Sequence, residues 1–432
     1  MKRSIATVLG IALAASMTLA GCGDDDSAEA GGPVTLSLSG WSLATTPEFK
    51  TLADGFHAAN PDVTVSVKEY DAANYDTQMI ADLAAGSAPD VYVQKNLKNF
   101  YTYQNGKQLL DVSDVAAQLG DKAGGVKNYA VDGKTYAVPY RNDGWVLFYN
   151  KALFDKAKVA YPDGSWTWDT YATTSKQLTA ALKKADSKAL GDYQHTWEST
   201  TLGFAAAQTP GANPESGDFS YLKPYYARSL DLQKSGAQVS FGTATTNKLT
   251  YQAQFGKQEA AMMTMGTWYI ATLRSQQEKG DADTFEWGIA PAPQFDASTT
   301  GTSKTPVTFG DPTGLGINPA ISKAKVAAAK KFLAYAAGAP GAKALAGIGI
   351  TPADTAAVTA DFFSLKGVPT DELSKFAFGT HDIKPENPVS KHTAGLGNVL
   401  KDLHSGVLSG SKDIDAAITE AQTRAKNEVL NK

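Results

Sequence analysis

Apolar and polar positions alternate in the first folded part of the chain and then change to a helical spacing. Residues 34–41, VTLSLSGW, alternate as a strand that ends at a glycine and a tryptophan. Apolar residues then recur at i, i+3, i+4 and i+7 over 49–56, with Thr46 as the expected N-cap and Pro47 at the first helical position. Residues 63–67 alternate again. The pattern predicts a strand, a helix and a second strand.

A helix over 73–85 and a third apolar strand over 89–93 continue this order. Strands that alternate with helices predict right-handed βαβ units and an open, largely parallel sheet. Ligands of such sheets bind beyond the carboxyl ends of the strands. Trp41 lies at one such end and Asn96 follows another, so both are candidate ligand-binding residues.

The later part of the chain predicts further helices and short strands. Thr167 can cap a helix, and the segments 256–268 and 285–293 are typical of short apolar strands. Residues 294–310 are rich in Ser, Thr and Gly and are expected to form a loop. Residues 322–338 predict an amphipathic helix that ends at a glycine. With 432 residues the chain is long enough for two α/β domains with ample cores.

The N-terminus has the three parts of an export signal. Two basic residues precede an apolar segment, 5–19, which is too short to span a bilayer comfortably. Small residues and Cys22, the only cysteine of the chain, follow. Residues 22–33 are polar and poor in bulky side chains, as expected of a flexible tether. We therefore interpret 1–21 as a cleaved signal peptide.

The four residues LAGC, at positions 19–22, resemble the lipobox of bacterial lipoproteins. Cleavage before the cysteine of that motif is coupled to attachment of diacylglycerol to its sulfur. Two acyl chains, at about 0.8 kcal/mol per buried methylene, hold a protein on a membrane where one chain is marginal. The resemblance implies lipidation of Cys22 and a place on the extracellular face of the cell membrane, which is periplasmic if the host has an outer membrane. The alternative is an ordinary secretory signal with a chance cysteine.

Charge and motif spacing exclude several function classes. Loss of the leader, with its two basic residues, changes the formal net charge from −4 to −6. A mildly acidic chain without basic runs is not expected to bind nucleic acid. No histidine pair has the spacing of a zinc site and no G-x-S-x-G elbow is present, so neither a metal nor a cofactor is expected.

Five blocks of sequence together resemble the extracellular solute-binding proteins (family 1) of ABC importers, in the sugar-binding, maltose-binding-protein-like group. The blocks are APDVYV at 88–93, DGKTYAVPY with VLFYNKALF over 132–154, SWTWDTY at 165–171, FGKQEAAMMTMGTW at 255–268, and WGIAPAP at 287–293. Their order and spacing are more specific than any one block, and the resemblance runs from about residue 34 to the C-terminus.

The resemblance implies a periplasmic-binding-protein-like (type II) fold, in which two α/β lobes are joined by a multi-crossing hinge and close on a ligand in the cleft between them. The expected lobes are 34–139 with 317–350, and 140–316 with 351–432. It also implies a monomer that takes up a carbohydrate, a di- or oligosaccharide, and delivers it to the transmembrane permease subunits. An enzymatic activity is not expected.

The chemistry of sugar binding, together with the resemblance, selects the candidate site. A pyranose has hydroxyls at its rim and a faintly positive C–H face, so it favours carboxylate or amide acceptors beside a large aromatic ring. The candidate ligand-binding residues are Trp41, Asn96, Asp143, Trp197, Gly266, Trp268 and Asp311. Polarity and location alone add Arg141 and Glu198.

Four of the candidates have a structural alternative. Trp268, expected to stack on the sugar, could instead be a core residue, as could Trp41 and Trp197. Asp143, expected at the first hinge crossing, could be a turn or surface aspartate. Paired carboxylates for glycoside hydrolysis are defined by their separation in space, so a secreted glycan-degrading enzyme stays open as an alternative function, as does a carbohydrate-binding surface adhesin.

Overall fold

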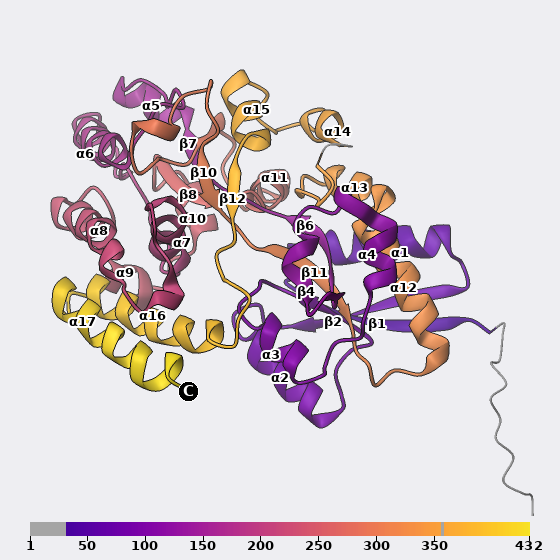
Figure 1. Cartoon of the computed structure of the whole chain (residues 1–432). Helices are drawn as coiled ribbons and strands as arrows, with labels where there is room; N and C mark the ends of the chain where they lie inside the picture. Colours follow the sequence, from indigo (N-terminus) through magenta and orange to yellow (C-terminus); the bar gives the residue numbers. More distant parts are fainter. Residues whose placement is uncertain (1–31, 356–357) are drawn as a thin grey trace, which may run out of the picture. The chain divides into compact units, whose positions relative to one another are not determined.

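The computed structural model describes residues 32–355 and 358–432. Residues 33–432 form one compact unit (Figure 1). The expected signal peptide, Cys22 and all but the last two residues of the expected tether (22–33) lie outside the described residues. Among the residues that are described, no helix is both long and apolar enough to cross a membrane.

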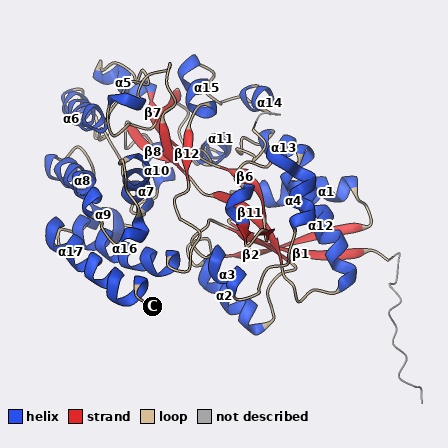
Figure 2. Ribbon diagram, in the orientation of Figure 1, coloured by secondary structure: helices blue, strands red, loops and turns tan. Residues whose placement is uncertain are grey.

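Five strands form the first sheet, which is drawn in red among the helices that cover it (Figure 2). Their order is β2-β1-β3-β11-β6. They are β1 (Val34–Trp41), β2 (Val63–Tyr70), β3 (Val91–Gln94), β6 (Val138–Asn142) and β11 (Pro312–Ile317). β1 pairs in parallel with both β2 and β3, and β11 runs antiparallel to β3 and β6. The prediction of a largely parallel sheet is confirmed, because β1, β2, β3 and β6 run the same way and β11 opposes them.

Helices cover this sheet and complete what we call the first lobe. Its helices are α1 (Glu48–Ala59), α2 (Tyr75–Ala85), α3 (Phe100–Asn105), α4 (Ser113–Leu119) and α12 (Lys323–Ala337), and a small hairpin is formed by β4 (Ala130–Val131) and β5 (Lys134–Thr135). Helix α12 packs on β1, β6 and β11, and α1 packs on β2. The buried faces of these elements form one continuous apolar core.

The start of α1 differs from the prediction. Thr46 is not the N-cap: Pro47 occupies that position, and no side chain caps the helix. The reason is a tight turn before the helix, in which the backbone N–H of Thr46 donates to the carbonyl oxygen of Ser42 at 2.7 Å. By contrast Thr167 caps its helix as predicted, accepting from the N–H of Thr170.

Three antiparallel strands, in the order β8-β7-β9, form the centre of the second lobe. They are β7 (Trp145–Asn150), β8 (Met262–Gly266) and β9 (Trp287–Pro291), and a separate parallel pair is formed by β10 (Val307–Phe309) and β12 (Asp382–Lys384). The predicted strand over 256–268 is shorter than expected, since its first residue still belongs to a helix. The predicted loop over 294–310 contains β10, whose three residues are too few to give a periodic signal.

Helices surround the second lobe and build its own core. They are α5 (Lys151–Ala157), α6 (Trp168–Lys184), α7 (Ser199–Gln208), α8 (Lys223–Ser235), α9 (Phe241–Thr246), α10 (Tyr251–Gly256), α11 (Tyr269–Lys279), α14 (Thr359–Phe363), α15 (Glu372–Gly379), α16 (Thr393–Leu408) and α17 (Ile414–Arg424). Helix α13 (Ala339–Ala346) contributes side chains to both cores.

The chain passes between the two lobes at three places, which we call the crossings. They are residues 143–144 between β6 and β7, 310–311 between β10 and β11, and 351–354 between α13 and α14. The expected lobe boundaries at 139/140 and 316/317 fall inside β6 and β11, both of which pair within the first sheet.

Candidate functional site

The three crossings lie side by side, although they are far apart in the sequence. The N–H of Asn142 donates to the carbonyl of Thr351 at 3.4 Å, and the N–H of Ala353 donates to the carbonyl of Tyr140 at 3.0 Å. At Gly310 the chain passes so near the carbonyl oxygen of Asp143 that a β-carbon on residue 310 would lie 2.0 Å from it. Only glycine fits this close approach.

A buried ion cluster occupies this junction. Arg141 donates through Nη1 to Glu48 Oε2 at 2.5 Å, and its Nε lies 2.8 Å from Asp143 Oδ2. Glu48 is fully buried and Asp143 is 3% exposed. Burial alone would lower the pKa of Arg141, but the two carboxylates outweigh it and raise that pKa. The guanidinium is thus charged and shared between two acids, one from α1 and one from the first crossing.

Hydroxyl groups extend the cluster to the second lobe. Thr267 Oγ1 donates to Asp143 Oδ1 at 2.7 Å, and Thr351 Oγ1 donates to Thr267 Oγ1 at 3.0 Å. Burial raises the pKa of Asp143, and Arg141 and Thr267 oppose that rise. Both carboxylate oxygens of Asp143 therefore already contact groups of the chain, and a ligand at this place would share them.

Trp268 follows this threonine and lies over a glycine of β8. A β-carbon on Gly266 would come within 1.8 Å of the Trp268 ring. The indole is half-buried, and its centroid lies 5.6 Å from that of Trp145 in an edge-to-face arrangement. Because Trp145 is opposite Gly266 in the sheet, the missing side chain at 266 leaves the space that the indole occupies.

Trp197 lies in the same aromatic group and is 41% exposed, an unusual exposure for so large a ring. Its ring centroid is 4.5 Å from His195 and 5.6 Å from Tyr251. Burial raises the pKa of Tyr251, and a hydrogen bond with Trp268 opposes the rise. Tyr251 therefore connects two of the predicted tryptophans.

Trp41 and Asn96 lie at the carboxyl ends of β1 and β3, as predicted. Trp41 is 8% exposed, and its ring contacts Phe49 and Tyr75 edge to face with centroids 4.9 and 5.1 Å away. The ammonium nitrogen of Lys95 lies 5.4 Å from the centroid of the same ring. Asn96 is half-buried and accepts a hydrogen bond from the N–H of Lys98 at 3.1 Å.

Asp311 fastens the second crossing to both lobes. Its Oδ2 accepts from the N–H of Leu97 at 3.1 Å and from Asn387 Nδ2 at 2.7 Å, and its Oδ1 accepts from the N–H groups of Glu386 and Asn387 at 2.8 and 3.2 Å. Burial raises the pKa of Asp311, and burial together with Asp311 raises the pKa of Glu386 to about 8. Four N–H groups of the chain thus occupy this carboxylate.

The structure brings some of the candidates together and separates others. Asp143, Gly266 and Trp268 are joined through Thr267, and Trp197 reaches Trp268 through Tyr251. Trp41 and Asn96 belong to the first lobe, and Glu198 lies 3.8 Å from Lys98 Nζ.

Sequence reasoning missed four residues of this region, Glu48, Lys95, Tyr251 and Thr267. Glu48 had the signal of an acidic residue in a first helical turn, but its partner Arg141 is 93 residues away. Lys95 and Thr267 each adjoin a candidate residue and could have been found from that position.

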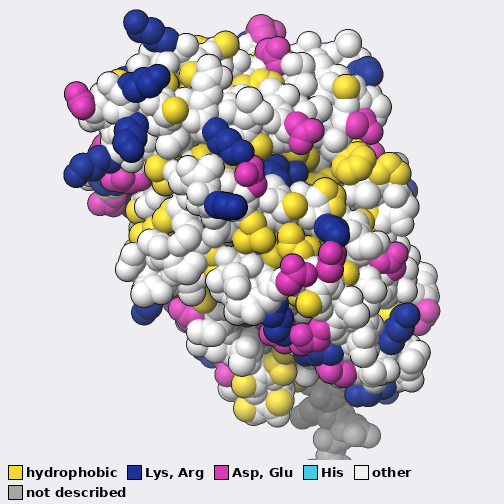
Figure 3. Space-filling model, turned by 90° about the vertical axis from the view of Figure 1, so that its left-hand side faces the viewer, with side chains coloured by type: hydrophobic (Ala, Val, Ile, Leu, Met, Phe, Trp, Pro, Cys, Tyr) yellow, Lys and Arg dark blue, Asp and Glu magenta, His cyan; other side chains and the backbone are white. Residues whose placement is uncertain are grey.

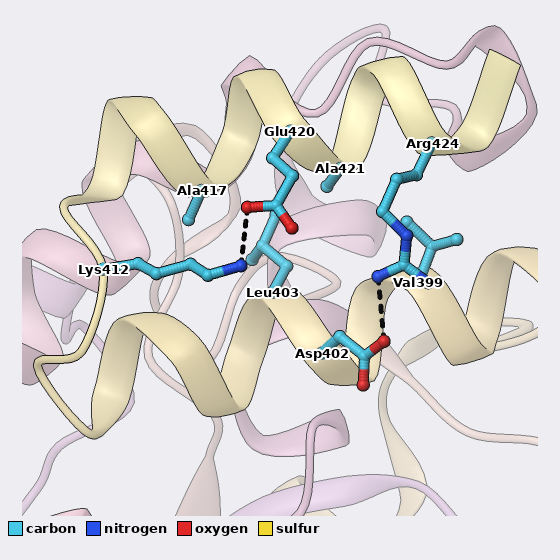
Figure 4. Close-up of a pocket in the computed structure, with 8 residues that line it drawn as sticks. All are labelled: Val399, Asp402, Leu403, Lys412, Ala417, Glu420, Ala421 and Arg424. Carbon is cyan, nitrogen blue, oxygen red and sulfur yellow. Dashed lines mark hydrogen bonds and ion pairs between the residues drawn. The ribbon is translucent and has the colours of Figure 1, made fainter. Parts of the chain in front are cut away.

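Two cavities of the described chain lie elsewhere and are small. Figure 4 shows one between α16 and α17, where Lys412 pairs with Glu420 at 2.5 Å and Arg424 with Asp402 at 2.8 Å. Its volume is about 10 Å³, which holds at most a single water. Among the described residues no group of three or more His, Cys, Asp or Glu side chains could hold a metal ion.

Charged side chains of both signs are interspersed on the face of the molecule shown in Figure 3, and apolar side chains gather toward its middle. This face therefore carries no extended field of one sign.

Comparison with known proteins identifies the family. A sequence model of bacterial extracellular solute-binding proteins matches residues 51–370. The fold is similar to that of a sugar transporter of Rhizobium etli in an open conformation, with 29% identity, a TM-score of 0.75, and coverage of 91% of this chain and 99% of the other. An ABC substrate-binding protein of Listeria monocytogenes, in complex with cycloalternan, has 20% identity, a TM-score of 0.74, and coverage of 91% and 98%.

A binding protein of Brucella abortus is 26% identical over 145 residues, which are 31% of this chain and 33% of that protein. The match therefore spans about a third of the length of this curated relative. The family model, in contrast, covers well over half of this chain. Together with two α/β lobes joined by three crossings, this shows that the chain belongs to the bacterial extracellular solute-binding proteins.

Proposed function

We propose that this protein is the substrate-binding component of an ABC importer and that it captures a carbohydrate outside the cell. The observation that carries the proposal is a large aromatic ring close to a buried carboxylate at the first crossing. The Trp268 ring lies over Gly266, and Thr267, between these two residues, donates a hydrogen bond to Asp143. The sugar transporter of Rhizobium etli, at 29% identity, supports the same substrate class.

The roles of these residues follow from sugar chemistry. The half-buried indole of Trp268 offers a face for the C–H groups of a pyranose, and exposed Trp197 offers a second ring. Asp143 accepts hydrogen bonds from sugar hydroxyls while it remains paired with Arg141, because a carboxylate has about four acceptor sites. Gly266 admits the Trp268 ring. Trp41, Asn96 and Asp311 act at the edge of the first lobe.

Binding works by a shift between open and closed forms. A ligand that touches both lobes only in the closed form favours that form by its additional contacts. The crossings provide the few loop residues that change conformation, as in other hinged binding proteins. The closed surface is then the one that the permease recognises.

We also propose that the chain is a monomeric lipoprotein. The sequence LAGC supports diacylglycerol attachment at Cys22, which holds the receptor on the extracellular face of the membrane next to its permease. A Cys22→Ser variant is expected to lose acyl labelling and membrane association. If both persist, the lipoprotein proposal is wrong, and the carbohydrate proposal is unaffected.

A ligand screen tests the main proposal. The mature chain is mixed with panels of mono-, di- and oligosaccharides, polyols, amino acids and peptides, and the melting temperature is measured. We expect one carbohydrate class to raise it, no turnover of that carbohydrate, and loss of the rise in Trp268→Ala. A rise with amino acids or peptides only, or consumption of the sugar at catalytic protein concentrations, would overturn the proposal.

A further inference from the structure

The side chain of Lys95 is a half-buried cation that has no acidic partner among the described residues. Its ammonium nitrogen donates to the carbonyl oxygen of Ala72 at 2.5 Å and lies 5.4 Å from the centroid of the Trp41 ring. Within the described part of the chain, no carboxylate lies within 4.0 Å of it. An ammonium group has three donors, and within the described residues only one of them makes a hydrogen bond.

The two acids that act electrostatically on Lys95 accept hydrogen bonds from other groups. Asp76 accepts from the Tyr103 hydroxyl at 3.2 Å, and Asp71 accepts from the N–H and the side-chain amide of Asn74 at 2.8 and 3.0 Å. Burial lowers the pKa of Lys95, Asp76 and Asp71 oppose this, and Arg141 adds to the lowering. Burying this ammonium group therefore costs free energy of folding, and a methionine at the same position would not carry that desolvation cost.

Lys95 lies where a ligand of this sheet is expected. It directly follows β3, beside the carboxyl end of β1, and the carboxyl ends of parallel strands are where such sheets bind ligands. Its backbone is also connected to the crossings, because Thr313 Oγ1 donates to the Lys95 carbonyl at 3.4 Å and Arg141 Nη2 donates to the same Thr313 Oγ1 at 3.4 Å.

The position of Lys95 also changes the role of Trp41. One face of the Trp41 ring is occupied by the ammonium group, and the ring contacts Phe49 and Tyr75 at its sides. A cation over an indole face is stabilised by the ring quadrupole. The Trp41 ring thus stabilises the ammonium group of Lys95, as a carboxylate partner would.

We infer that Lys95, supported by Trp41, is a specificity-determining residue of the first lobe, whose ammonium group donates charge-assisted hydrogen bonds to acceptor oxygens of the bound carbohydrate. This inference rests on the proposed function. The acceptor is a hydroxyl of a neutral sugar or a carboxylate of an acidic sugar, and the two differ in how strongly they depend on the positive charge.

The test compares Lys95→Met with wild type in the mature chain, by calorimetric titration with the neutral and acidic sugars that raise the melting temperature of wild type. We expect affinity to fall by about tenfold to a hundredfold, since hydrogen bonds to charged groups are of that strength. If neutral sugars also lose affinity, by about tenfold, the acceptor is a sugar hydroxyl. If only acidic sugars lose affinity, the acceptor is a sugar carboxylate. Without sugar, the melting temperature should be unchanged or higher.

Lys68→Met is the matched control. Lys68 also lies over a ring, 4.9 Å from the Tyr70 centroid, but it is more exposed and pairs with Asp82 at 2.8 Å. Its replacement should leave sugar affinity unchanged. The inference is overturned if Lys95→Met binds sugar with an affinity within about twofold of wild type. It is also overturned if Lys95→Met melts several degrees below wild type in the absence of sugar. If wild type binds no sugar, the proposed function fails, while the sugar-free melting temperatures still decide whether Lys95 is held for the fold.

Discussion

The indole ring of Trp268 lies directly over Gly266, two residues earlier, with ring carbon Cζ3 only 1.8 Å from where a β-carbon on residue 266 would be. The two residues therefore constrain each other, since no side chain at 266 is compatible with the ring in its present place. Trp145, opposite Gly266 on β7, contacts the same ring. The strand thus determines where the candidate stacking surface lies.

Gly266→Ala is expected to displace the Trp268 ring. Overpacking of this kind costs about 1–3 kcal/mol, so the free energy of unfolding should fall by that amount and sugar affinity should fall with it. Urea denaturation and the tryptophan emission spectrum measure both changes. Gly242→Ala in α9 is the control, because nothing lies within 4 Å of its β-carbon and alanine is the better helix former. If Gly266→Ala and Gly242→Ala change the free energy of unfolding equally, the Trp268 ring does not exclude a side chain at position 266.

Arg141→Met should be among the most destabilising single changes in this chain. It leaves Glu48 and Asp143 buried without their cation, and breaking a buried ion pair by removing one partner costs about 3–5 kcal/mol. Chemical denaturation measures the loss. Arg424→Met removes exposed ion pairs and is expected to cost at most about 1 kcal/mol. A loss at Arg141 no larger than this control would show that the cluster does not depend on its guanidinium.

Asp311→Asn should destabilise the second crossing although it preserves shape. Both oxygens of Asp311 accept from N–H groups, and an amide would place its own donor against one pair of them. An unsatisfied buried donor costs about 1–3 kcal/mol, which thermal unfolding would detect. Asp296→Asn is the control, because Asp296 is exposed and asparagine caps as well as aspartate does. No difference between the two would argue against the fastening role of Asp311.

Two buried histidines should each lower the stability of the fold as the solution is acidified below neutral pH. Burial lowers the pKa of His195 and of His404 to about 4 from an ordinary value of 6.5. Between these values the unfolded chain binds more protons than the folded chain, so the free energy of unfolding decreases as pH falls through this window, by on the order of 3 kcal/mol for each imidazole at most.

Urea unfolding at several pH values measures the slope. On going from pH 7 to pH 4.5, His404→Gln should lose less stability than wild type, or gain more, whatever the effect of the substitution at pH 7 itself. Glu386 acts in the opposite sense, because its raised pKa of about 8 makes the folded chain the better proton binder between its ordinary range and pH 8. An unchanged slope in His404→Gln would remove that imidazole from the explanation.

Local patterns predicted the first lobe better than the second. The alternation over 34–41 and 63–67 and the spacing over 49–56 are long enough to identify β1, β2 and α1. The helix α7 was not predicted, because it is buried on several sides and its apolar residues follow no single face. Short pieces such as β10 gain their structure from pairing with β12, which is far away in the sequence.

The same limit applies to the site. Asp143, Gly266 and Trp268 could be selected from the sequence, because a family resemblance and a chemical reason pointed to them. Their ligand roles stay predictions. The sequence could not show that Glu48 shares a guanidinium with Asp143, since that contact depends on how α1 and the first crossing pack. Nor could it show that an ammonium group takes one face of Trp41.

The bonds between neighbouring crossings limit how the two lobes can move. A twist at 143–144 alone would break the contacts with Thr351 and force the backbone at Gly310 against Asp143. The three segments must therefore turn together, about a line that runs through them. Opening is then described by one angle, and spectroscopic labels at several pairs of positions across the lobes should report distances that all change in the same step.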